Sequence, residues 1–131
     1  MAGQIPDGFK DILNKRGYAH LATLMQDGSP QVTPVWYDFD GMYIRINSAK
    51  GRLKDKNMRR AKQVASIQDP DNPYRYLAIR GDIEEITENG ADAHIDALAK
   101  KYLDKDRYPF RTPGEVRVIY KIRPNKVSTV G

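Results

Sequence analysis

Hydrophobic and polar residues alternate along several short segments of this chain, and such alternation predicts half-buried β-strands. In segment 42–47, for example, Met42, Ile44 and Ile46 share one side, with more polar residues between them. The pattern predicts six strands, at 18–26, 30–39, 42–47, 64–68, 74–87 and 115–124. Turn residues at 27–29 and 40–41 join the first three, so we expect an antiparallel meander in the N-terminal half.

Two other segments have the hydrophobic period of amphipathic helices. In the first, at 6–17, Asp7 is expected to cap the first turn and Gly17 to end the helix. The second, at 91–103, is expected to bury four large residues: Ile95, Leu98, Tyr102 and Leu103.

Antiparallel strands with helices at the start and between the later strands indicate a mainly β fold. We expect a small, closed or nearly closed antiparallel barrel with flanking helices, formed by a single domain over residues 1–131. Pro34 predicts an edge or irregular strand at 30–39, and Gly81 predicts a bend in the strand at 74–87. The last strand is expected to turn four residues inward: Val116, Val118, Tyr120 and Ile122.

The positive charge of the chain is concentrated in one place. Residues 48–60 contain six Lys or Arg and one acid, Asp55, whereas the whole chain has 22 basic and 17 acidic residues, so the rest is electrically neutral. We predict a short helix from about 51 to 61, capped by Ser48, with Leu53 and Met58 as apolar anchors. One concentrated cluster favours a small anionic ligand, because nucleic-acid affinity grows with the number of phosphates neutralised across a surface.

Composition and motifs argue against several kinds of chemistry. The chain has no Cys, which excludes disulfides and thiol catalysis and favours a cytoplasmic location. No apolar run is long enough to span a bilayer. His20 and His94 have no ligand partner at a metal-binding spacing, and nucleophile and nucleotide-binding motifs are missing. The acidic group at 82–85 is predicted to be solvated, so an enzyme with this sequence would rely on a cofactor.

Three segments occur in an informative order: LATLMQDGSPQVTPVWYDFDG, MYIRINSAKGRLKDKNMRR and VASIQDPDNPYRYLAIRGDIEEI. Together they resemble the flavin and deazaflavin split-barrel oxidoreductases, a superfamily often called pyridoxamine 5′-phosphate oxidase-like. The closest similarity is to the branch that uses the deazaflavin coenzyme F420. That branch has a DG-x-P-x-x-x-x-V-x-Y hairpin followed by R-x-K-x-x-N-[LM]-R-R, and both motifs are present here, at 27–37 and 52–60. The resemblance implies a six-stranded antiparallel split β-barrel of the FMN-binding type.

In that family the basic segment after the third strand binds the cofactor phosphate, which by position implies that Arg52 and Lys54 are phosphate ligands. The chemistry agrees, because the planar fork of Arg can grip phosphate oxygens in pairs and Lys supplies a compact charge. The alternative, that these side chains form a solvated basic face, stays open at this stage.

The resemblance also implies cofactor contacts from other segments. The strand against the ring system corresponds to Thr33, Pro34 and Val35, and the end of the third strand, where ring and phosphate tail meet, to Asn47 and Ser48. Tyr74 matches an aromatic residue that reaches the site from a second subunit. Trp36 and Tyr37 are expected in the core or in a dimer interface.

The resemblance implies an oxidoreductase in which bound coenzyme F420, or alternatively FMN, transfers a hydride to or from a small organic substrate. It implies a homodimer with the cofactor at the interface. The further charges at Lys50, Lys56 and Arg60 would suit the polyglutamate tail of F420.

Two alternatives remain open. One is a nucleic-acid-binding small β-barrel, with Trp36, Tyr37 and Tyr43 as stacking platforms beside the basic stretch. The other is a protein that holds a flavin without turnover. Our first expectation is a small-molecule substrate with no metal, nucleic-acid or membrane partner.

Overall fold

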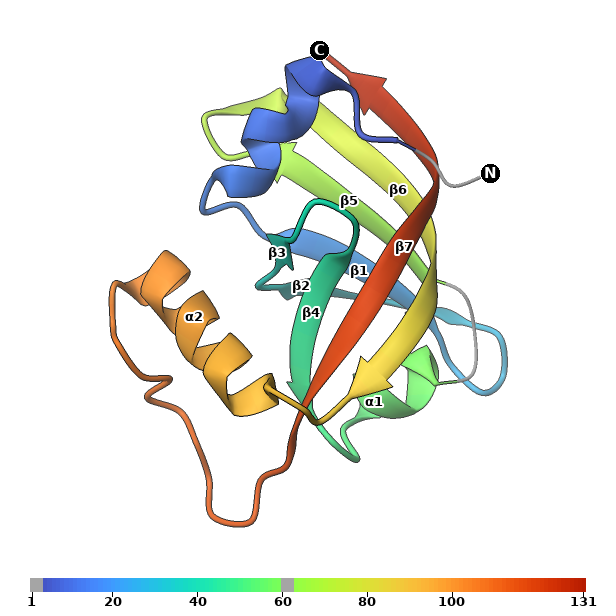
Figure 1. Ribbon diagram of the computed structural model, residues 1–131. Coiled ribbons are helices and arrows are strands. Elements are labelled where there is room, and N and C mark those ends of the chain that lie inside the picture. The colour runs from blue at the N-terminus through green and yellow to red at the C-terminus, as the bar shows by residue number, and fades with distance from the viewer. Residues whose placement is uncertain (1–3, 60–62) are drawn as a thin grey trace.

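A computed structural model of the protein describes residues 4–59 and 63–131 (Figure 1). Its strands form one antiparallel sheet of seven, in the order β2-β1-β5-β6-β7-β4-β3. The strands are β1 (Ala19–Leu24), β2 (Pro30–Val35), β3 (Asp38–Phe39), β4 (Ile44–Ala49), β5 (Gln63–Asp69), β6 (Asn72–Thr87) and β7 (Arg117–Val130). The helices are the 3-10 helix η1 (Asp7–Asn14) and the α-helices α1 (Leu53–Met58) and α2 (Ala91–Leu103).

The mainly β fold of split-barrel type is confirmed, but the predicted strand at 30–39 is two strands. β2 ends at Val35 and β3 begins at Asp38, and these two strands are the opposite edges of the sheet. Because only two residues join them, the sheet must curl until its edges are neighbours. The edges are not paired with each other, so the barrel is split and not closed. The edge position predicted from Pro34 is therefore confirmed, since β1 is the one strand that β2 pairs with among the described strands.

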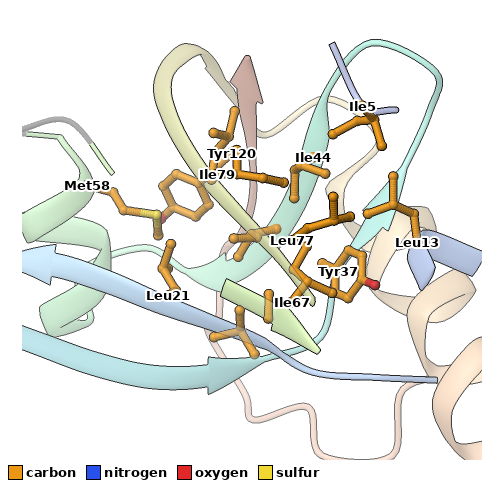
Figure 2. Packing of buried hydrophobic residues seen from close by; sticks show 14 of the residues in the cluster. Ile5, Leu13, Leu21, Tyr37, Ile44, Met58, Ile67, Leu77, Ile79 and Tyr120 are labelled. Carbon is orange, nitrogen blue, oxygen red and sulfur yellow. The ribbon is translucent and has the colours of Figure 1, made fainter. Parts of the chain in front are cut away.

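The inward faces of the strands form one hydrophobic core, shown in Figure 2. Tyr37 and Tyr120 are its largest fully buried side chains, and Tyr37 donates a hydrogen bond to the carbonyl of Ile12 at 3.1 Å. The chain between β2 and β3 thus contributes a buried ring, which confirms the core position expected for Tyr37. The core includes Ile5, Leu13, Leu21, Ile44, Met58, Ile67, Leu77 and Ile79.

The outer helices follow the predicted positions with corrected ends. η1 has no side-chain cap, and Asp7 instead pairs with Lys10 at 2.9 Å. η1 ends at Asn14, before Gly17. In α2, the predicted inner residues Ile95 and Leu98 are buried and Tyr102 is half-buried, whereas Leu103 is exposed at the last turn, because the helix ends there and leaves the sheet.

The last two strands are long and bent. The pairing of β6 with β7 shifts between Arg80 and Gly81, which confirms the predicted bend. A Cβ at Gly81 would lie 2.5 Å from the Ile122 side chain, so the close approach requires glycine. Val116 precedes β7 and is exposed, contrary to prediction, while the other three expected inner residues of that strand are buried. Across the described ranges, no helix is both long and apolar enough to cross a membrane.

Candidate coenzyme-binding pocket

The only acid of the basic stretch, Asp55, fixes α1 to the barrel. Its buried carboxylate accepts hydrogen bonds from the Gly51 N–H at 2.9 Å, from the Arg59 Nε at 3.0 Å and from the hydroxyl of Tyr120. Burial raises the pKa of Asp55, but these donors outweigh it and the pKa is lowered overall. The carboxylate therefore stays charged and ties the basic segment to a core tyrosine of β7.

Two further residues of the motif also serve as anchors. Asn57 is fully buried, and its Nδ2 donates to Thr23 Oγ1 at 3.2 Å and to Gln31 Oε1 at 3.3 Å, which ties α1 to β1 and β2. Met58 lies in the core, as predicted. Leu53 does not, because it is 45% exposed at the start of the helix.

The helix is shorter than predicted, and Ser48 does not cap it. Arg52 occupies the N-cap position, and Ser48 lies in β4 with a fully buried hydroxyl that has no hydrogen-bond partner within the described residues. The helix ends at Met58, so the expected extension is wrong at Arg59, while positions 60–61 lie outside the described residues.

Two cations at the start of α1, Arg52 and Lys54, line a pocket of about 190 Å³, which we call the α1 pocket. Five residues predicted from the sequence line it: Pro34, Val35, Asn47, Arg52 and Lys54. They come from β2, β4 and the first turn of α1 with its N-cap Arg52, so the fold brings together three segments that are separate in the chain. Five lining residues that the sequence did not assign to the site complete the wall: Trp36, Ile95, Tyr108, Phe110 and Arg117.

Lys54 is the most informative member of this pocket. Its side chain is half-buried and forms no ion pair or hydrogen bond with any described residue. Its pKa is lowered, first by burial and then by the nearby charges of Arg52 and Arg117. A partly desolvated cation beside two like charges is unfavourable unless an anion joins it.

Arg52 is more exposed and only loosely paired. Its Nη2 lies 3.8 Å from Glu115 Oε2, and its side chain is 48% exposed. A second pocket, of about 480 Å³, shares Arg52 with the first and is also lined by Lys50 and Gly51. Lys50 is paired with Glu88 at 3.4 Å, in an exposed contact that is weak in water.

The other predicted site residues are placed differently. Thr33 is half-buried on β2 but does not line the pocket, and neither does Ser48. Asn47 lines it, yet its amide already contacts Ala91, His94 and Arg117. Tyr74 is 83% exposed, follows the turn between β5 and β6 and does not line the pocket. Figure 1 shows that turn at the end of the barrel opposite α1.

A larger pocket, of about 550 Å³, lies elsewhere, around η1 and β3, and contains none of the predicted residues. Its two basic side chains are already paired, Lys10 with Asp7 at 2.9 Å and Arg123 with Glu84 at 3.2 Å. We place the candidate site at α1 because Lys54 there is a half-buried cation that forms no ion pair or hydrogen bond with any described residue.

The three aromatic residues predicted as nucleic-acid stacking platforms already have other contacts. Tyr37 is fully buried, Trp36 is stacked on Tyr102 with ring centroids 5.2 Å apart, and Tyr43 donates a hydrogen bond to Glu84. Trp36 contributes to the pocket wall and not only to packing. Among the described residues there is no group of His, Asp or Glu that could hold a metal ion.

The arrangement therefore offers cations at one part of a pocket and apolar or aromatic side chains at the rest, which suits a flat molecule with an anionic group. The fold and this pocket define a protein of the split-barrel, flavin-binding class. Comparison with known proteins agrees: the sequence profile of the pyridoxamine 5′-phosphate oxidase family matches residues 5–131. The chain belongs to this family, which places it among flavin-related oxidoreductases.

Solved structures are similar over nearly the whole chain. A protein described as an F420 reductase is 35% identical, with a TM-score of 0.82, and the match covers 95% of this chain and 98% of that one. A conserved hypothetical protein from Mycobacterium tuberculosis is 22% identical, with a TM-score of 0.76 and coverages of 98% and 86%. A flavocytochrome from Azotobacter vinelandii is 15% identical, with a TM-score of 0.72 and coverages of 98% and 68%, and like the second protein it supports the fold alone.

Sequence reasoning missed Arg117 because it was assigned to the outward face of a strand. In the structure Arg117 and Ile119 are both buried on that face. A signal was present in the sequence, since residues 116–120 are nearly continuously apolar, which indicates a strand covered on both sides.

Proposed function

We propose that this protein is an oxidoreductase that binds a phosphorylated flavin or deazaflavin coenzyme in the α1 pocket. The proposal rests on one observation: Lys54 is a half-buried cation with no counter-ion among the described residues. It lies beside Arg52 on a turn that Asp55 and Asn57 anchor. A coenzyme phosphate would supply the missing negative charge. Charge-assisted hydrogen bonds to phosphate are the contacts that these two residue types make best.

Within this proposal the chain's residues bind and orient the coenzyme. Arg52 and Lys54 hold the phosphate, and the edge strand around Pro34 and Val35 lies against the ring, where the missing N–H of proline leaves no unsatisfied donor. When bound, the coenzyme supplies hydride transfer to or from a small organic substrate.

Of the two coenzymes, we favour F420 over FMN. The second pocket shares Arg52 with the first and adds Lys50, so an anionic chain that continues past the phosphate would meet a further cation. F420 has such a polyglutamate tail and FMN does not. The 35% identity with a protein described as an F420 reductase points the same way.

We further propose that the protein works as a homodimer. The α1 pocket, at about 190 Å³, is smaller than the several hundred Å³ typical of sites that enclose a ligand of this size. A second copy would complete the walls, and the exposed Tyr74 is a ring that could reach the partner's pocket. Molar mass by light scattering tests this, and a monomer with and without coenzyme would contradict it.

Absorbance titration of the purified protein with F420 and, separately, with FMN tests the proposed function. We expect micromolar or tighter binding of F420 and weaker binding of FMN. The reverse order would overturn the choice of coenzyme, and no binding of either would overturn the function. Anaerobic reduction of the bound coenzyme, followed by mixing with small organic oxidants, separates an enzyme from a protein that only stores the coenzyme.

A further inference from the structure

Arg117, at the start of β7, is a buried cation in the wall of the α1 pocket. It is 5% exposed, and three contacts hold its guanidinium. The Nε donates to Asn47 Oδ1 at 2.8 Å, the Nη1 donates to Glu115 Oε1 at 2.5 Å, and the Cζ lies 5.1 Å from the centre of the Tyr108 ring. Its Nη2 makes no hydrogen bond with any described residue.

A relay of polar side chains fixes this orientation. Asn47 Nδ2 donates to the Ala91 carbonyl at 2.9 Å and lies 3.1 Å from His94 Nδ1, so its oxygen must face Arg117. His94 Nδ1 therefore accepts, and His94 Nε2 carries the hydrogen that faces Asp38 Oδ2 at 3.2 Å. The relay joins β3, α2, β4 and β7, and it holds the guanidinium in place before any ligand arrives.

The charges at the pocket do not balance. Glu115 is the only carboxylate that the described residues place on Arg117 and Arg52, at 2.5 Å and 3.8 Å. With Lys54 added, three cations face one anion, which leaves a surplus of two positive charges. A phosphate monoester such as that of FMN carries about 1.5 to 2 negative charges at neutral pH, which is close to this surplus. The phosphate of F420 is a diester, because a tail continues from it, and its single negative charge would offset about half of the surplus.

We infer that Arg117 joins Arg52 and Lys54 as a third cation that binds the coenzyme phosphate, contacting a phosphoryl oxygen through its free Nη2. We call these three residues the phosphate clamp. This assignment rests on the proposed function, and it adds a residue from the far end of the chain that no part of the basic motif contains. A guanidinium held by Asn47 and Glu115 loses little conformational freedom on binding, so its contact is preorganised.

The test compares Glu115→Gln with the double variant Glu115→Gln/Arg117→Gln. In the double variant an amide faces an amide, so no buried carboxylate is left without a partner. Affinity for FMN and for riboflavin, which lacks the phosphate, is measured by absorbance titration, with thermal denaturation to establish folding. If wild type binds only F420, its chromophore without the phosphate replaces riboflavin. Arg123→Gln, an exposed arginine later on β7, controls for the loss of one positive charge.

We expect Glu115→Gln alone to bind FMN more tightly than wild type, because a competing carboxylate is gone. Relative to it, the double variant should lose about tenfold or more in FMN affinity and less than twofold in riboflavin affinity. Arg123→Gln should match wild type for both.

Equal FMN affinities in the two Glu115 variants would overturn the inference and leave the proposed function standing. Loss of FMN and riboflavin binding in equal measure would also overturn it, because Arg117 would then contact the ring. Wild type that binds no coenzyme would overturn both proposals. If the double variant does not fold, Arg117→Lys replaces it, with several-fold weaker FMN binding expected and unchanged affinity counting against the inference.

Discussion

Charged side chains are paired with one another at one end of the barrel, whereas at the other end some cations lack a close counter-ion. Near the turn between β5 and β6, Asp69 accepts hydrogen bonds from Lys15 and from Arg75, both at 2.9 Å, and Arg75 also pairs with Asp11 at 2.7 Å. These contacts hold η1 against the β5–β6 hairpin. At the other end, near α1, Lys54 has no counter-ion among the described residues. Arg52 has one, Glu115, at a distance of 3.8 Å.

The difference separates structural charge from functional charge. Paired groups at the η1 end satisfy one another, so they can hold the fold without a ligand. The α1 pocket instead keeps cations near one another on a turn whose backbone is anchored by Asp55 and Asn57. Such an arrangement costs stability in the free protein, and it is expected where an anion binds.

The largest expected effect is on coenzyme affinity. Arg52→Ala/Lys54→Ala should weaken binding of F420 or FMN by about 100-fold or more, since each lost charge-assisted contact is worth about 1.5–3 kcal/mol. Its melting temperature should stay level or rise, because mutual repulsion is relieved. The matched control is Lys10→Ala, which removes a cation from the larger pocket around η1 and β3, where Lys10 is paired with Asp7. It should bind the coenzyme as wild type does. An affinity within twofold of wild type would refute our site.

The next largest effect is expected at Asp55, which holds the turn that carries Arg52. Asp55→Ala should lower the free energy of unfolding by about 2–3 kcal/mol, because the Gly51 N–H and the Tyr120 hydroxyl lose a charged acceptor. It should also weaken coenzyme binding, since the turn that carries Arg52 is released. Tyr120→Phe removes only one donor and should leave affinity unchanged. Urea unfolding and titration measure the two properties, and normal binding by Asp55→Ala would show that the anchor is irrelevant to the clamp.

A smaller change is expected from the η1 end. Arg75→Met should lower the melting temperature by several degrees, because Asp69 loses a partner and the Gly8 carbonyl loses a donor. Coenzyme affinity should fall far less than in Arg52→Ala/Lys54→Ala, since within one chain this network lies at the opposite end of the barrel from α1 and only the neighbouring Tyr74 is proposed to reach the partner's pocket. A folded Arg75→Met protein that binds as weakly as Arg52→Ala/Lys54→Ala would contradict the division into two ends.

The smallest effect is a change in pH dependence. The pKa of Asp69 is lowered from 3.8 to about 2, chiefly by the hydrogen bond from Lys15. Its contribution to stability is therefore present above about pH 4 and is lost as the pH falls toward 2. Asp69→Asn should show a shallower loss of stability between pH 5 and pH 2 than wild type, measured by urea unfolding. Asp106→Asn, at an exposed site, should keep the wild-type slope.

Much of the fold was predictable from local pattern. Alternation located the strands, and the inner faces of β4 and β7 were correct at Ile44, Ile46, Val118 and Tyr120. The division of 30–39 into β2 and β3 was not predictable, because it depends on which distant strand each half pairs with. Leu103 and Val116 were misplaced for a related reason, since the ends of elements are decided by what covers them.

For the site, the sequence by itself determined where the positive charge lies and which family motif carries it, because both are properties of consecutive residues. Only the tertiary structure decided which of those charges are satisfied. The fold buried Asp55 as an anchor and left Lys54 without a counter-ion among the described residues. It also brought Arg117 from the last strand to the same pocket. The physical reason is that the free energy of a charge depends on its neighbours in space, and residues 52, 54 and 117 become neighbours only when the sheet curls.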